Sequence, residues 1–108
     1  MALFKSDEEL VKKAEGVAGK LKGVKTHQLR RIYSQVQSIY QLQNPDLAKS
    51  RLILLKPQLA YAASRSLSKG FKEWMSDLNG LIDKVGDSPE NLEKFYQYVQ
   101  SVVAYHKE

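Results

Sequence analysis

The sequence SKGFKEWMSDLNGLIDKVG, residues 68–86, decides the fold class. Its apolar residues recur every three or four positions, which places them on one face of an α-helix. Ser68 is a residue type that caps helix N-termini, and Gly86 is a type that ends helices. We therefore predict a helix over roughly residues 68–85. Its broad apolar stripe should form the main part of the core: Leu67, Phe71, Trp74, Met75, Leu78, Leu81, Ile82 and Val85.

Four other segments show the same helical periodicity, and each begins at a residue type that caps helices. No segment shows the two-residue alternation of a half-buried strand. A chain of 108 residues suits one domain. We therefore expect an all-α, compact single-domain bundle of about five helices that spans residues 1–108. The other predicted helices run from Ser6 to about Gly23, from Thr26 to about Gln43, from Asn44 to about Arg65, and from Ser88 to the C-terminal region.

Pro57 lies inside the predicted third helix. Proline removes a backbone donor and disfavours helical geometry at the preceding residue, so this helix must kink or break there. The two outcomes predict different directions for the residues that follow. On the same helix, the periodicity predicts burial of Leu47, Leu54 and Leu55.

The last predicted helix has an apolar stripe from Leu92 to Val103. Tyr98 and Tyr105 lie seven residues apart, beside Val102 and off that stripe. We interpret Tyr98, Val102 and Tyr105 as a second contact surface for another protein. An equal alternative is that the two tyrosines are simply half-exposed side chains of a monomer.

Charge is strongly polarised along the chain, beneath a net charge of +5. Between Lys20 and Lys69 there are ten Lys and Arg residues and one acidic residue, Asp46. From Gly70 onward, four basic residues face seven acidic ones. A basic stretch of this kind is typical of proteins that meet a polyanion or an acidic surface, because the summed potential attracts such partners.

The sequence offers little for catalysis, for metal binding or for a small-molecule substrate. Cysteine is absent, which suits a reducing cytoplasmic location, and no Gly-rich phosphate loop occurs. His27 and His106 lie far apart without ligand-spaced neighbours, so we predict no metal and no cofactor. The longest apolar runs fall short of a membrane span, and we expect no membrane partner.

The run LLKPQLAYAASR, residues 54–65, combines cations, an aromatic residue and small residues in the middle of the basic region. Tyr61 and Arg65 have i, i+4 spacing, so a guanidinium group and a ring can share a helix face. Cations interleaved with an aromatic are what a groove for single-stranded nucleic acid needs. The alternative is that Tyr61 belongs to the core.

Three stretches resemble a known family, the small subunit of the type III-A CRISPR–Cas (Csm) effector complex. They are LRRIY at residues 29–33, LLKPQLAYAASR at residues 54–65 and VVAYHK at residues 102–107. Together they span most of the chain in order. Gln58 and Ser64 stand where the family often has Lys and Gly, which argues against residue 58 as a phosphate contact.

This resemblance implies a non-catalytic, RNA-binding subunit in antiviral defence that lines the channel where target RNA pairs with guide RNA. The implied partners are target single-stranded RNA, the guide–target duplex, and the backbone, large and sister small subunits. Together with the basic surface, it predicts the residues that contact the target-RNA backbone, with Tyr61 supporting or stacking nearby. They are Arg30, Arg31, Lys49, Arg51, Lys56 and Arg65.

Two functions of other classes are also compatible with these patterns. A helical protein-interaction adaptor would use the basic face to bind acidic partner surfaces without nucleic acid. A DNA-binding helix-turn-helix regulator is disfavoured by the neutral glutamine face of residues 26–43.

Overall fold

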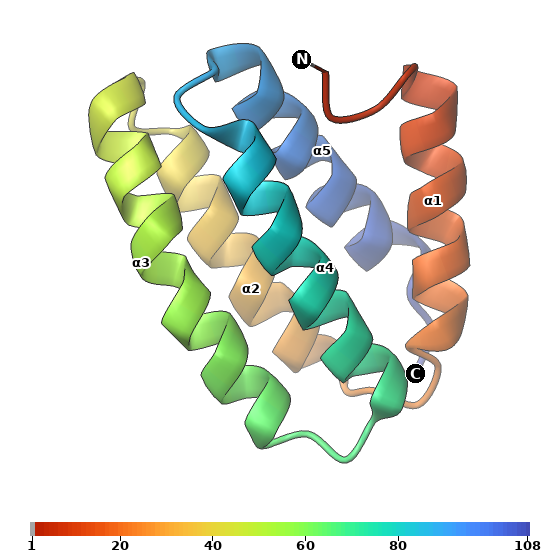
Figure 1. Cartoon of the computed structure of the whole chain (residues 1–108). Coiled ribbons are helices and arrows are strands. Elements are labelled where there is room, and N and C mark those ends of the chain that lie inside the picture. The colour runs from red at the N-terminus through yellow and green to blue at the C-terminus, as the bar shows by residue number, and fades with distance from the viewer. Residues whose placement is uncertain (1) are drawn as a thin grey trace.

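Five α-helices joined by short connections make up the computed structural model, which describes residues 2–108 (Figure 1). No strand occurs among these residues. The prediction of an all-α bundle is therefore confirmed. The helices are α1 (Asp7–Lys20), α2 (Thr26–Tyr40), α3 (Pro45–Ser64), α4 (Lys69–Val85) and α5 (Pro89–Tyr105).

Side-chain caps start four of the five helices. Ser6, Asn44, Ser68 and Ser88 each accept a hydrogen bond from the backbone N–H three residues later, which satisfies a donor that the first turn leaves unpaired. Gly86 ends α4 with a positive φ of 56°, a conformation that glycine adopts without a steric penalty. These helix limits agree with the prediction to within a few residues.

The predicted cap of α2 is wrong. Lys25 occupies the capping position without a side-chain hydrogen bond, and Thr26 is the first helical residue. The Thr26 hydroxyl instead donates to Oε2 of Glu108 at 2.9 Å, and this bond lowers the pKa of the Glu108 carboxyl. His106 Nε2 lies 3.0 Å from the carbonyl oxygen of Leu21. The C-terminal residues are thus tied to the connection between α1 and α2.

α3 is one continuous helix of 20 residues that passes through Pro57. Of the two predicted outcomes, the break is therefore excluded, and a kink stays a prediction. Pro57 removes the amide that would bond to the carbonyl of Ile53, and both residues are exposed. Water can replace the missing donor there, because the site is not closed off by other helices.

α4 and α5 form the centre of the bundle. α5 packs against α1, α2 and α4, whereas α4 packs against α3, α5 and α1. α1 and α3 lie at opposite edges (Figure 1). The stripe of α4 from Phe71 to Val85 is buried as predicted, but Leu67 precedes the helix and is fully exposed.

α3 buries a narrower face than its sequence predicted. Leu55 is buried, together with Ala48, Leu52 and Leu59. Leu47 and Leu54 are exposed, so the prediction of their burial is wrong. The reason is that α3 is an edge helix, and α4 and α2 cover only part of its circumference.

α5 buries a wider face than predicted, because helices pack on several of its sides. Tyr98 and Val102 are completely buried, so they cannot form the exposed contact surface that we expected. The Tyr98 ring lies 5.4 Å from that of Phe4, and burial raises the pKa of its hydroxyl. Tyr105 is exposed, and its role in a subunit contact stays a prediction.

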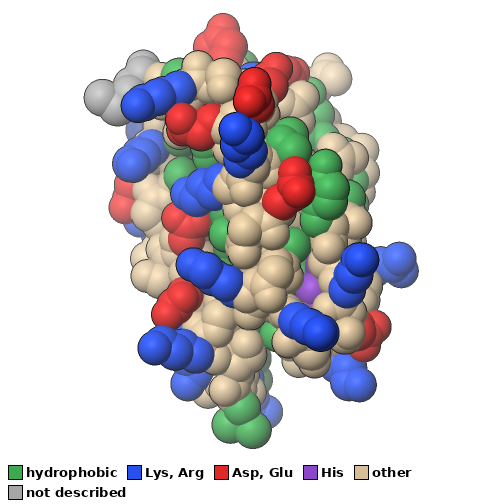
Figure 2. All heavy atoms as spheres, turned by 90° about the vertical axis from the view of Figure 1, so that its right-hand side faces the viewer, with side chains coloured by type: hydrophobic (Ala, Val, Ile, Leu, Met, Phe, Trp, Pro, Cys, Tyr) green, Lys and Arg blue, Asp and Glu red, His purple; other side chains and the backbone are tan. Residues whose placement is uncertain are grey.

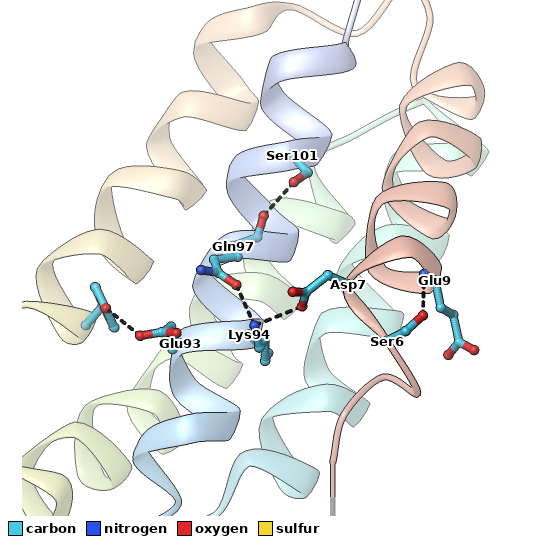
Figure 3. Close-up of polar contacts among 8 residues, drawn as sticks. Ser6, Asp7, Glu9, Glu93, Lys94, Gln97 and Ser101 are labelled. Atoms are coloured by element: carbon cyan, nitrogen blue, oxygen red, sulfur yellow. Dashed lines mark hydrogen bonds and ion pairs between the residues drawn. The ribbon is translucent and has the colours of Figure 1, made fainter.

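Polar contacts join α5 to its neighbours at the edges of the core. Lys94 Nζ lies 2.9 Å from a carboxylate oxygen of Asp7 and also donates to Gln97 (Figure 3). Asp7 raises the pKa of Lys94 chiefly through this bond. On the other side of α5, the Tyr96 ring stacks against Tyr33 and Tyr40 of α2, with centroid separations of 5.8 and 4.6 Å.

Gly70 sits where the start of α4 meets the end of α1. A Cβ atom at this position would lie 2.3 Å from the carbonyl oxygen of Lys20, so the two backbones would have to separate. We expect Gly70→Ala to lower the free energy of unfolding by roughly 1–3 kcal/mol, the usual cost of overpacking, measured by urea denaturation. Gly80→Ala is the matched control on the same helix, because its Cβ would meet nothing within 4 Å. The control should be neutral or stabilising, by up to about 1 kcal/mol. Equal effects of the two changes would contradict the close approach.

Tyr98 joins three helices through its hydroxyl. It donates to Oδ2 of Asp77 at 3.0 Å, and the other carboxylate oxygen of Asp77 lies 3.1 Å from Lys13 Nζ. Tyr98→Phe should lower the free energy of unfolding by about 1–2 kcal/mol, because it removes a donor to a partly buried carboxylate. Tyr105→Phe, the same change at an exposed position, should stay within roughly 0.5 kcal/mol of the parent. Thermal denaturation that ranks the two variants alike would refute a stabilising role for this bond.

Candidate nucleic-acid interface

Arg31, Tyr61 and Arg65 line one groove between α2 and α3. The groove is formed by the first half of α2, the second half of α3 and the residues around the start of α4. Its other polar lining residues are His27, Gln28, Gln35, Gln58 and Ser66, and no acidic side chain is among the residues that line it.

Tyr61 and Arg65 form a pair on the outer side of α3. The guanidinium carbon of Arg65 lies 5.3 Å from the centroid of the Tyr61 ring, a cation–π contact between residues one helical turn apart. The Tyr61 side chain is 62% exposed, so it does not belong to the core. An aromatic surface and a cation are thus presented together to solvent.

Arg31 supplies the cation from the α2 side of the groove. It is exposed, whereas its neighbour Ile32 is buried. In residues 2–108 the ion pairs involve Lys12, Lys13, Lys56 and Lys94 and none of the arginines. The guanidinium groups of Arg31 and Arg65 therefore have no ion-pair partner among residues 2–108.

A bridge between two amides separates this groove from a neighbouring hollow. The Gln35 side chain donates to the Gln58 side chain across the α2–α3 interface. Beyond the bridge, Arg51 lines a shallower hollow with Leu42 and Leu54. Gln58 therefore acts as a link between helices, and Arg51 lies outside the groove of Tyr61.

The remaining predicted contacts do not join the groove. Lys56 forms an ion pair with Asp83 of α4. Lys49 lines a hollow near the α4–α5 connection, which also contains Asp87 and Glu93. Arg30 is exposed but is not among the residues that line the groove. Only three of the seven predicted RNA-contacting residues thus share one site: Arg31, Tyr61 and Arg65.

His27 is a groove residue that the sequence reasoning did not assign to the site. It lies one helical turn before Arg31, and this i, i+4 spacing could have placed it on the same face. Within residues 2–108 no cluster of three or more His, Cys, Asp or Glu side chains is arranged to hold a metal ion.

On the side of the bundle away from α3, charge is distributed differently from the groove. Figure 2 shows the side on which α1 lies, where basic and acidic side chains are interspersed. α2 and α3 together contain one acidic residue, Asp46, at the start of α3. The predominantly basic surface therefore belongs to α2 and α3. None of the helices in the described part of the chain has the length and apolar character needed to cross a membrane.

These features define a small all-α protein with an exposed aromatic and unpaired arginines in one acid-free groove. A protein-family model described as Csm2 Type III-A matches residues 5–108, which is almost the whole chain. The protein therefore belongs to the Csm2 type III-A family and is a small subunit of the type III-A CRISPR–Cas effector complex. No curated protein and no solved structure matches the chain.

Proposed function

We propose that the groove between α2 and α3 binds target RNA within the type III-A effector complex, beside the strand paired to the guide. The observation that supports this proposal most directly is the cation–π contact of Arg65 with the exposed Tyr61 ring. This contact lies in a groove without acidic lining residues. Arg31 provides a second cation from the opposite helix. The subunit would then act in antiviral defence as an RNA-binding wall in the cytoplasm.

The proposed contacts divide into two kinds. The guanidinium groups of Arg31 and Arg65 each present a planar set of donors that suits phosphate oxygens. The exposed part of the Tyr61 ring can stack on an unpaired base, an interaction that every base permits. Because neither kind reads base edges, binding should depend little on sequence and strongly on salt.

The other predicted cations have smaller parts in this proposal. Arg30 and Lys49 are exposed and add to the positive potential that attracts RNA without lining the groove. Lys56 is compensated by Asp83. We propose that the subunit binds without cleaving, because His27 is the one histidine in the groove and no carboxylate lines the groove to orient it.

Arg31 and Arg30 offer a matched test of the groove. Arg31→Ala should weaken binding of fluorescent single-stranded RNA and should reduce the slope of log K against log salt by about 0.7, the value for one phosphate contact. Arg30→Ala should change affinity less, because its side chain does not line the groove. Neither change should lower the melting temperature, since both residues are exposed. Titrations at two or more salt concentrations measure these effects.

RNA binding that is absent, or unchanged by Arg31→Ala and Arg65→Ala, would reject the proposal and would favour an adaptor that contacts only protein.

The role of the Tyr61 ring can be tested separately from its hydroxyl. Tyr61→Phe should keep most of the RNA affinity, whereas Tyr61→Ala should lose about 1–3 kcal/mol, the usual value of one base stacked on an aromatic residue. Tyr105→Ala serves as the control for removal of an exposed tyrosine elsewhere. The same titration measures all three variants. Equal affinities for Tyr61→Ala and Tyr105→Ala would exclude stacking on Tyr61.

A further inference from the structure

Exposed leucines lie near Arg51 on α3 and on the turn that follows α2, and we refer to Leu42, Leu47, Arg51 and Leu54 as the leucine patch. Leu54 is 57% exposed, and Leu42 and Leu47 also lie on the surface. Leu42, Arg51 and Leu54 line one shallow hollow between the two helices. Exposed leucines gathered in this way are typical of a surface that another molecule covers.

The spacing along α3 favours a partner that runs parallel to the helix axis. Leu47, Arg51, Leu54 and Gln58 alternate at intervals of four and three residues. Residues spaced in this way form a nearly straight stripe along a helix, as in the seam between two packed helices. The hollow between α2 and α3 continues this stripe on one side. A third helix fits this geometry because it presents side chains at the same repeat.

The charge of Arg51 indicates which side chains the partner helix must carry. Arg51 has no ion pair within residues 2–108, and none of the residues that line its hollow is acidic. A partner that covers the leucines would remove water from Arg51, so it must supply a carboxylate to avoid leaving the charge unpaired.

RNA is a poorer occupant for this surface. Exposed leucines offer nothing to phosphate groups, and the lining of this hollow contains no aromatic ring on which a base could stack. The groove of Tyr61, in contrast, has arginines that can bind phosphate and an aromatic ring on which a base can stack. The Gln35–Gln58 bridge divides the two surfaces.

We infer that the leucine patch docks an amphipathic α-helix of another subunit of the effector complex. Apolar side chains of that helix cover Leu42 and Leu54, and an Asp or Glu carboxylate pairs with Arg51. This inference goes beyond the proposed RNA function, because it uses a separate surface and holds whether or not the groove binds RNA.

The first test measures binding of the fluorescently labelled subunit to a reconstituted effector complex. This complex contains the remaining subunits and guide RNA but neither this subunit nor target RNA. We expect Leu54→Gln and Arg51→Ala each to weaken binding by about fivefold or more, as at the centre of a protein interface. Ile53→Gln is the matched control. Ile53 is adjacent and 51% exposed but does not line the hollow, so its change should stay within about twofold. Melting temperatures of all three variants should match the parent.

The second test identifies the occupant. A photo-crosslinking amino acid at position 54 should form an adduct with a helical segment of another subunit that contains Asp or Glu, whereas the same group at position 53 should not. Crosslinks from position 54 to RNA or to a second copy of this chain would overturn the inference. No adduct, or equal binding of Leu54→Gln and Ile53→Gln, would also overturn it. Leu54→Gln should keep the full salt-dependent RNA affinity of the isolated subunit, so failure of the docking inference can be distinguished from failure of the RNA proposal.

Discussion

Burial of the apolar face of α4 is the constraint on which the rest of the structure depends. Trp74, Leu78 and Leu81 are almost entirely removed from water, and α4 makes contact with α3 on one side and with α5 and α1 on the other. Because α3 is held to α4 through its buried leucines, much of the rest of its surface points away from the centre. The residues available for function on α3 are therefore those at positions such as 51, 54, 61 and 65.

Local signals in the sequence were sufficient to place the helices. The caps at Asn44, Ser68 and Ser88 and the stop at Gly86 each depend on residues within one turn, so they could be predicted before any packing was known. Thr26 is not the cap but the first helical residue, and its hydroxyl bonds to Glu108, 82 residues away in the sequence. Such a distant partner leaves no trace in the local pattern.

The width of each buried face could not be predicted in the same way. Tyr98 lies off the main stripe of its own helix but is enclosed, because Phe4 from the segment before α1 and Asp77 of α4 lie against it. Leu54 has an apolar side chain at a helical repeat but is exposed because α3 is an edge helix. For the candidate site, the i, i+4 spacing predicted the contact of Tyr61 with Arg65. That Arg31 joins them, and that Asp83 pairs with Lys56, depends on how α2 and α4 pack against α3.

Lysines form the ion pairs of this structure, whereas arginines lie in the groove of Tyr61 and in the leucine patch. In the described part of the chain, every ion pair uses a lysine. Three of the four pairs join two helices: α1 to α4, α3 to α4, and α5 to α1. The exposed cations of α2 and α3 that have no ion pair within residues 2–108 include Arg31, Arg51 and Arg65, together with Arg30 and Lys49. Guanidinium groups are more weakly hydrated than ammonium groups and can bond to planar oxyanions while stacking on a ring. Arg65 stacks on Tyr61 in this way. The partners that we propose there are a phosphate for Arg65 and an unpaired base for Tyr61. Arg51 has the same group among leucines, so a carboxylate carried on an apolar helix face satisfies both the charge and the surface around it.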